Sequence, residues 1–216
     1  MNVRTVSAPG LVLLAVLASG CLSLIPKVPQ PRDYRIDYPS PVIQHSPIPV
    51  VLRVAPVRVA ALYDREPFAY AQGPYRVGYR YYHRWATAPG QMLTDLLVRD
   101  FSQSGLYRSV QQGASVLVAD YQLDVRIDRF EQELLGDRCA AAVVAHASLQ
   151  RLRPGMDNPV RLQRTYKESE PIDCEAPEDF VRGMSRAIAR ISEHLQEDVY
   201  AAVQATEQEA APQTSL

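Results

Sequence analysis

The side chains best suited to covalent chemistry in this chain are its three cysteines, Cys21, Cys139 and Cys174. A thiol can take up a lipid, form a disulfide or bind a metal ion, and its position in the sequence favours one of these outcomes. No histidine stands at a metal-ligand spacing from Cys139 or Cys174, so the sequence predicts no metal site and no cofactor. Cys21 and the later pair therefore need separate explanations.

Cys21 follows a stretch with the layout of a secretory signal. Arg4 precedes an apolar run over residues 11–17 that is too short to cross a bilayer, and small residues follow the run. The stretch Leu17-Ala18-Ser19-Gly20-Cys21 resembles the lipobox of bacterial lipoproteins. The resemblance implies that residues 1–20 are removed, that diacylglycerol is attached to Cys21, and that its amino group carries an acyl chain such as palmitate. The other interpretation is an ordinary secretory signal with an incidental cysteine.

A lipid on Cys21 would anchor the chain to the surface of a membrane, and the chain would not span the membrane. Each buried methylene contributes about 0.8 kcal/mol, so three acyl chains would hold the protein on the bilayer. Residue 22 is leucine, not the aspartate that lipoproteins retained in the inner membrane tend to carry, so resemblance implies the periplasmic face of the outer membrane. Inner-membrane anchoring is the alternative. With a net charge of −1 and no basic domain, the chain is not expected to bind nucleic acid.

Cys139 and Cys174 remain as an even pair, and outside the cytoplasm such a pair favours a disulfide. Two predicted strands flank the turn over residues 154–159 and form a hairpin. In a hairpin without a bulge, paired residue numbers have a constant sum, and the sum for Pro154 and Pro159 equals that for Cys139 and Cys174. We therefore expect the two thiols to face each other at the open end of the hairpin. Two separate thiols are the alternative.

Arrangements typical of catalysis are not found in the sequence. The histidines, at positions 45, 83, 146 and 194, are isolated, and there is no phosphate-binding glycine loop. Residues 183–187, centred on Ser185, approximate a nucleophile elbow, but they fall inside a predicted helix. An elbow needs a strand-to-helix turn to expose its serine. The sequence therefore predicts no catalytic residue and no enzymatic activity.

The stretch over residues 75–85 is rich in aromatic residues and arginines, and its period-two alternation predicts a strand with an aromatic face and an arginine face. We expect its aromatic face to pack in the core under a helix, with the arginines in solvent. If the aromatic face is accessible instead, it could form a groove for a lipid, a peptide or a partner protein. The candidates for such a groove are Tyr75, Tyr79, Tyr81 and Trp85.

The remaining periodicities place further strands and two helices. Strands are expected over residues 34–38, 50–63, 121–128, 140–152 and 160–171, with a bulge or an edge position at Pro56. Apolar residues at helical spacing predict one helix over residues 88–104 and a second of roughly 25 residues that starts near Pro177. The predicted fold is α+β, a mainly antiparallel sheet with helices packed on one face, including the long C-terminal helix.

The chain is expected to have four parts. Residues 1–20 are the signal peptide, and residues 21–49, with seven prolines, form a tether that contains a short docking strand. Residues 50–203 form the domain, and residues 204–216 lack periodicity and are predicted to be a disordered tail.

The order of these features resembles a known family. After the lipobox come Tyr-Arg-Ile-Asp-Tyr at residues 34–38, Leu-Arg-Val-Ala-Pro-Val-Arg-Val at 52–59, Arg-Trp-Ala at 84–86 before a helix, and Asp-Tyr-Gln-Leu-Asp-Val at 120–125, followed by Arg-Phe at 129–130. The hairpin and the long helix complete the series. The order is similar to that of the ABC-type transport auxiliary lipoproteins, over residues 21–203.

The resemblance implies a part in moving lipids or other hydrophobic molecules between the inner and outer membranes. The implied partners are an inner-membrane ABC permease and ATPase and a periplasm-spanning protein with MCE domains, with membrane lipid bound through Cys21; a homo-oligomer is left open. A different envelope assembly lipoprotein, serving lipopolysaccharide export or a secretion channel, is the alternative function. An envelope hydrolase that uses Ser185 and His146 is a third hypothesis.

Overall fold

A computed structural model of the chain describes residues 29–113, 118–152 and 159–210. Residues from Pro31 onward belong to one compact unit; residues 1–30 form a separate unit, in which only residues 29 and 30 are described. The predicted signal peptide, the lipobox and Cys21 lie outside the described residues, as does the end of the predicted tail, residues 211–216.

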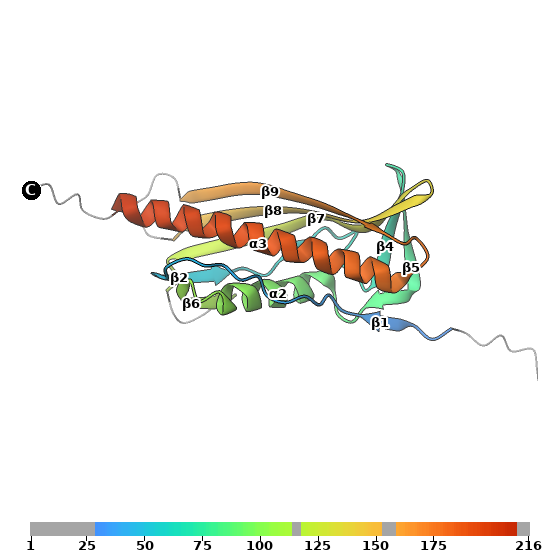
Figure 1. Ribbon diagram of the computed structural model, residues 1–216, viewed down its shortest axis with the longest axis horizontal. Helices are drawn as coiled ribbons and strands as arrows, with labels where there is room; N and C mark the ends of the chain where they lie inside the picture. The colour runs from blue at the N-terminus through green and yellow to red at the C-terminus, as the bar shows by residue number, and fades with distance from the viewer. Residues whose placement is uncertain (1–28, 114–117, 153–158, 211–216) are drawn as a thin grey trace, which may run out of the picture. The chain divides into compact units, whose positions relative to one another are not determined.

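One long strand, β7 (Tyr121–Leu135), organises the sheet (Figure 1). Along one edge it pairs antiparallel with β8 (Arg138–Arg151), and β8 pairs antiparallel with β9 (Val160–Ile172). Along its other edge three shorter strands run parallel to it, one after another: β2 (Ile48–Val54), β3 (Arg58–Val59) and β4 (Pro67–Gln72). The sheet is mixed, and its longest ladders are the antiparallel ones.

Three strands extend this arrangement outward. Strand β6 (Tyr107–Gln112) lies parallel to β2, β5 (Arg76–Trp85) lies antiparallel to β4, and the short β1 (Arg32–Tyr34) lies parallel to β5. The strand expected over residues 50–63 is interrupted between β2 and β3, where Pro56 lacks the amide hydrogen that a ladder requires. The strands predicted over 75–85, 121–128, 140–152 and 160–171 are confirmed. The short strand expected over residues 34–38 is wrong for residues 35–38, because β1 ends at Tyr34.

Two helices cover one face of the sheet, α2 (Pro89–Gln103) and α3 (Pro177–Ala210) (Figure 1). Proline stands at the start of α2, where its fixed φ suits the first turn. The helix ends before Gly105, which has a φ of +67° that side chains disfavour. The helix predicted over residues 88–104 is therefore confirmed, and with it the α+β class.

The core lies between the helices and the sheet. Alternate residues of β7 point into it: Tyr121, Leu123, Val125 and Ile127 are all at most 3% exposed. A register shift between Ile127 and Arg129 reverses the alternation, so that Phe130 is also buried. The packing leaves one small apolar cavity of about 20 Å³ between the sheet and both helices.

Helix α3 is longer than its sequence pattern predicts. It continues to Ala210, and Val203 and Thr206 are 0% and 5% exposed. Glu207 accepts hydrogen bonds from Tyr121 Oη at 2.7 Å and Arg151 Nη2 at 3.0 Å, which attaches the last turns to the sheet. The prediction of a disordered tail is therefore wrong for residues 204–210, because polar contacts with β7 and β8 hold turns that carry few apolar side chains.

Residues 35–47, here called the strap, lie against both helices. The amide of Ile36 approaches Met92 Sδ on α2 at 3.5 Å, and the amide of Asp37 donates to Ser185 Oγ on α3 at 3.2 Å. Further along, Tyr200 Oη on α3 donates to the carbonyl of Ser46 at 2.9 Å. Ile36 is 3% exposed, so this part of the Pro-rich segment is packed. A free spacer is therefore proposed only for the residues before Pro31.

Candidate functional site

The aromatic stretch over residues 75–85 lies mostly in β5, where its side chains do not share one face. Between Pro67 and Phe68 the partner on β5 changes from Arg84 to Arg80, so one step on β4 corresponds to four steps on β5. This bulge inserts an odd number of residues, and an odd number reverses which face each position takes. Odd positions before and after the bulge therefore point to opposite sides.

Trp85 follows the bulge and packs in the core. Its ring centroid lies 4.5 Å from that of Phe68, 5.3 Å from that of Phe130 and 5.8 Å from that of Phe180, and the residue is 2% exposed. The expectation of core packing is confirmed for Trp85. It is wrong for Tyr75, which is 97% exposed in the turn before β5, and for Tyr81, which is 68% exposed within the bulge, where the alternation of faces breaks.

Tyr79 and Tyr81 lie together, with ring centroids 6.3 Å apart. Tyr79 Oη donates to the carbonyl of Leu62 at 3.1 Å, and the guanidinium of Arg65 stands 4.8 Å from the Tyr79 ring centroid, a cation–π distance. We call Leu62, Arg65, Tyr79 and Tyr81 the aromatic patch. Of the four residues predicted for a groove, the structure brings only Tyr79 and Tyr81 together; Tyr75 occupies the turn between β4 and β5.

The other face of the same hairpin is closed by its own side chains. Tyr70 on β4 is paired with Gly78 on β5, and its ring lies so close that a Cβ at residue 78 would stand 2.4 Å from it. The guanidinium of Arg80 lies 5.7 Å from the centroid of the same ring. Only glycine allows this close approach. In the sequence, this close approach is indicated only by a glycine within an aromatic strand. The alternation of residue types does not predict it.

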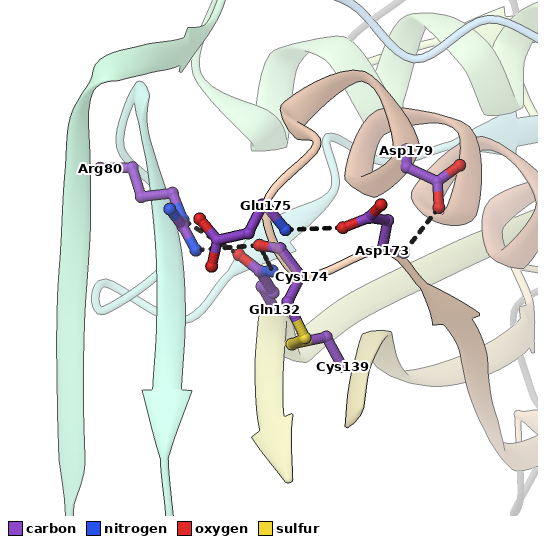
Figure 2. Close-up of a disulfide and its surroundings, with 7 residues drawn as sticks. All are labelled: Arg80, Gln132, Cys139, Asp173, Cys174, Glu175 and Asp179. Atoms are coloured by element: carbon purple, nitrogen blue, oxygen red, sulfur yellow. Dashed lines mark hydrogen bonds between the residues drawn. A yellow bond between two sulfur atoms is a disulfide. The ribbon is translucent and has the colours of Figure 1, made fainter. Parts of the chain in front are cut away.

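A disulfide joins Cys139, at the start of β8, to Cys174, in the connection between β9 and α3 (Figure 2). The bond predicted from the sequence is therefore present, with a Cα–Cα distance of 5.2 Å. The predicted register is wrong by two residues, because Cys139 is paired with Ile172 and Cys174 lies beyond the end of β9. The pairing of β8 with β9 also shifts near the turn, between Leu149 and Gln150. Paired residue numbers have a constant sum only in a hairpin without such a shift.

The disulfide-linked connection also holds the aromatic hairpin (Figure 2). The carbonyl of Cys174 accepts hydrogen bonds from Gln132 Nε2 on β7 at 3.1 Å and from Arg80 Nη2 on β5 at 3.4 Å. Arg80 Nε donates in turn to Gln132 Oε1 at 3.0 Å. Arg80 lies between Tyr79 and Tyr81 in the chain, so this network fixes the strand that presents the aromatic patch.

The start of α3 is fixed beside the same connection. The amide of Asp173 donates to Asp179 Oδ2 at 2.7 Å, and the amide of Glu175 donates to Asp173 Oδ1 at 2.9 Å (Figure 2). The amide of Asp173 and the guanidinium of Arg182 hold the pKa of Asp179 below its usual range. An ionised carboxylate at this position also suits the positive end of the helix dipole.

A buried polar centre that the sequence did not reveal joins the strap to both helices. Asp100 on α2 is 0% exposed. Its carboxylate accepts hydrogen bonds from Tyr38 Oη at 2.7 Å, Ser40 Oγ at 2.7 Å, Ser192 Oγ at 2.6 Å and Arg99 Nε at 2.9 Å. Burial and the neighbouring Asp100 carboxylate raise the pKa of Tyr38, so its hydroxyl stays protonated and donates. This centre stabilises the strap and offers no open face to a ligand.

Ser185 and His146, the residues of the hydrolase hypothesis, lie on different sides of the sheet. Ser185 is on α3, where its hydroxyl donates to the carbonyl of Val181 at 2.8 Å and accepts from the amide of Asp37. The His146 ring lies on the face without helices, in contact with Thr165 Oγ1 at 2.8 Å and Asp128 Oδ2 at 2.9 Å. A serine nucleophile and its base need direct contact, which this pair lacks.

The described residues contain no group of three or more His, Cys, Asp or Glu side chains that could hold a metal ion. Neither α2 nor α3 combines the length and the apolar character needed to cross a bilayer. The apolar cavity of about 20 Å³ under the helices is roughly the size of one water molecule, so an acyl chain does not fit it as it stands.

Comparison with known proteins shows which family and which solved structures the chain is similar to. Residues 35–196 match the family described as the ABC-type transport auxiliary lipoprotein component. The solved structure of XCC0632 from Xanthomonas campestris superposes with a TM-score of 0.73 at 22% identity, covering 82% of this chain and 99% of that one. A second structure, described only as an uncharacterized protein, gives a TM-score of 0.61 at 16% identity and covers 79% and 99%. No curated protein sequence matches the chain.

The matching region begins in the strap, contains strands β2 to β9 and the aromatic patch, and ends well inside α3. It therefore includes every element described above except β1 and the last turns of α3. The chain belongs to the family of ABC-type transport auxiliary lipoprotein components.

Proposed function

We propose that the mature chain is held on the periplasmic face of the outer membrane by lipid on Cys21. It acts there as the docking component of an ABC-transporter and MCE-type system that moves lipids or other hydrophobic compounds between the two membranes. Its partners are a periplasm-spanning protein with MCE domains and the inner-membrane permease and ATPase. The observation that carries the proposal is the family match over residues 35–196, joined to a lipobox that ends at Cys21.

The aromatic patch is the surface we propose for the protein partner. Tyr81 and Leu62 are 68% and 41% exposed, and Arg65 stacks on the Tyr79 ring beside them. Tyrosine and arginine are enriched at protein interfaces because they bury a large area at a low cost in conformational entropy. The contacts of Arg80 and Gln132 with Cys174 hold the strand that carries these side chains, so the patch is organised before a partner arrives.

A docking role also suits the interior of the domain. The core cavity has space for about one water molecule, and the buried side chains of β7, β8 and both helices fill the rest. A protein that carries lipid needs a cavity of several hundred cubic ångströms. We therefore propose that the interior of the domain does not carry lipid and that the domain organises the proteins that do.

Affinity capture from membranes tests this function. The lipidated chain is purified with a C-terminal tag after chemical crosslinking in cells, and the proteins bound to it are identified. We expect an MCE-domain protein to be captured by the wild-type chain and to be lost with Tyr81→Ala and Arg65→Ala. Val118→Ala, which changes a residue that is 88% exposed just before β7, is the matched control and should leave capture unchanged.

Three outcomes would contradict the proposal. Capture of a lipopolysaccharide-export or secretion-channel component in place of an MCE protein would support the other envelope assemblies. Equal capture by the Tyr81→Ala and wild-type chains would exclude the aromatic patch as the contact. A transport defect that follows Ser185→Ala or His146→Ala at normal protein levels would favour an enzyme.

A further inference from the structure

Two hairpin turns lie side by side at one end of the sheet. The turn between β4 and β5 contains Gly73, Pro74 and Tyr75, and the turn between β7 and β8 contains Gly136 and Asp137. Strand β4 pairs with β7 up to Gln72 and Leu134, so both strands end together and the two turns are neighbours (Figure 1). Both glycines have a positive φ, near +70°, which allows these tight turns.

These turns expose apolar side chains next to charged ones. Tyr75 is 97% exposed and Leu135, the last residue of β7, is 54% exposed. Arg76 and Arg138, which begin the next strands, are exposed as well, and the exposed Asp137 directly precedes Arg138. We call Pro74, Tyr75, Arg76, Leu135, Asp137 and Arg138 the tip surface. A tyrosine and a leucine flanked by arginines match the boundary between lipid headgroups and acyl chains, where amphipathic rings and basic side chains collect.

The first strand of the domain lies on the hairpin that carries the tip surface. Strand β1 lies parallel to β5, with Arg32 beside His83 and Tyr34 beside Trp85. Strand β5 runs back from His83 to Arg76 at the tip surface. His83 is seven residues from Arg76, which corresponds to about 23 Å along a strand.

The length of chain before the domain fits this geometry. Cys21 is ten residues before Pro31, and ten extended residues span at most about 35 Å. A lipid on Cys21 can therefore lie at the level of the tip surface, with about 10 Å to spare. The tip surface is the end of the domain that such an anchor allows to touch the bilayer.

From this we infer that the tip surface inserts into the headgroup region of the bilayer in which Cys21 is anchored, and so sets the orientation of the domain on the membrane. The inference rests on the lipid anchor of the proposed function. Tyr75 and Leu135 enter the interface, and Arg76 and Arg138 contact anionic headgroups. The aromatic patch, further along β5 at Tyr79 and Tyr81, is then held just above the membrane for a protein partner.

Tryptophan fluorescence of the full lipidated chain tests the inference. The variant Leu135→Trp is reconstituted in vesicles of phosphatidylethanolamine with one quarter phosphatidylglycerol, with and without brominated acyl chains. The native Trp85 is 2% exposed, and its emission is subtracted by means of the wild-type chain. We expect the emission of the added tryptophan to shift to the blue and to lose intensity in brominated vesicles.

The matched control is Val118→Trp. Val118 is 88% exposed and precedes β7, so it lies at the opposite end of the strand from Leu135. Its emission should remain that of a tryptophan in water and should not respond to bromine. Tyr75→Trp provides a second reporter at the tip in case Leu135→Trp folds poorly.

The outcomes separate this inference from the proposed function. A chain without acyl mass on Cys21 that stays in solution would overturn the anchor itself. An anchored chain whose tip tryptophans respond to bromine no more than Val118→Trp would overturn only the inference. Shielding of the tip in native membranes but not in brominated vesicles would show that a protein covers it, and would also overturn the inference.

Discussion

Strands β5 and β7 have similar alternating patterns of residues but lie in different environments. Both alternate large apolar residues with charged ones. In β7 the alternate residues Leu123 and Val125 are 0% and 3% exposed under two helices. In β5 the corresponding residue Tyr81 is exposed, Tyr79 is half-buried at the edge of the core, and Trp85 is fully buried in it.

The difference comes from what covers each strand. Strand β7 pairs with β8 along its whole length on one edge and with β2, β3 and β4 in turn on the other, and α2 and α3 pack on one of its faces. Strand β5 lies between β4 and the three-residue β1, and its bulge sends the two halves of the aromatic series to opposite faces. The alternation of apolar and charged residues indicates that a strand has two unlike faces. It does not indicate which of these faces is buried.

The largest effect is expected from the core of β7. Leu123→Ala should lower the free energy of unfolding by about 4 kcal/mol, because it leaves a cavity where no neighbouring side chain can move in freely. Tyr81→Ala on β5 should change it by less than about 0.5 kcal/mol, since that side chain is 68% exposed. Urea unfolding of both variants measures the difference. Similar losses for the two variants would mean that Tyr81 is packed.

A second effect concerns the covalent link between these regions. The Cys139→Ser and Cys174→Ser double variant should lose about 3 kcal/mol, because the bond closes a loop with a sequence separation of 35. The release of Cys174 should also loosen Arg80, so proteolysis of the native state should cut the β4–β5 hairpin earlier than the β7–β8 hairpin. Equal protection of the two hairpins would show that Arg80 does not depend on the disulfide.

A third, smaller effect tests the close packing within the β4–β5 hairpin. Gly78→Ala should cost about 2 kcal/mol, because the added methyl group meets the Tyr70 ring at 2.4 Å. The same change in a Tyr70→Ala background should cost much less, since the obstructing ring is gone. The double-mutant cycle is measured by chemical unfolding. An additive result would show that the ring moves aside without cost.

The smallest effect is a pH dependence at the junction of β1 and β5. Burial, together with the charges of Arg32 and Arg80, lowers the pKa of His83. A lowered pKa means that the folded chain binds this proton less readily than the unfolded chain. The contribution to stability is therefore present above about pH 6.5 and is lost as the pH falls through the lower folded pKa.

His83→Gln should reduce the change in thermal midpoint between about pH 7 and pH 5. His194→Gln is the control, because His194 is exposed on α3, and this variant should retain the dependence of the wild-type chain. A His83→Gln variant with the full pH dependence would assign that dependence to other groups.

Sequence reasoning was most successful where structure is local. The β8–β9 hairpin, the helix over residues 89–103 and the disulfide follow from periodicity, turn residues and cysteine pairing within short distances along the chain. The predictions fail where the structure depends on contacts between segments that are distant along the chain. The hairpin register was wrong by two residues because the position of Cys174 beyond β9 depends on contacts with Gln132 and Arg80, which come from other strands.

The candidate site was only partly predictable. Alternation predicts the strand and its aromatic residues, but the division into Trp85 in the core, Tyr79 at its edge and Tyr81 outside depends on the pairing with β4. Strands β4 and β6 went unrecognised, since neither shows clear alternation. The polar centre around Asp100 is not predictable from the sequence, because its donors are distant along the chain. Tyr38 in the strap is 62 residues from Asp100, and Ser192 on α3 is 92 residues from it.

By itself, the sequence determined the α+β class, the strands with two unlike faces, both helices, the pairing of Cys139 with Cys174, and a family membership that rests on the order of these elements. Only the tertiary structure decided which side of β5 is covered, where its bulge reverses the alternation, and how far α3 extends. Periodicity arises from the geometry of one element and can be read along the chain. Burial depends on which distant segment packs against that element, and the sequence does not state this locally.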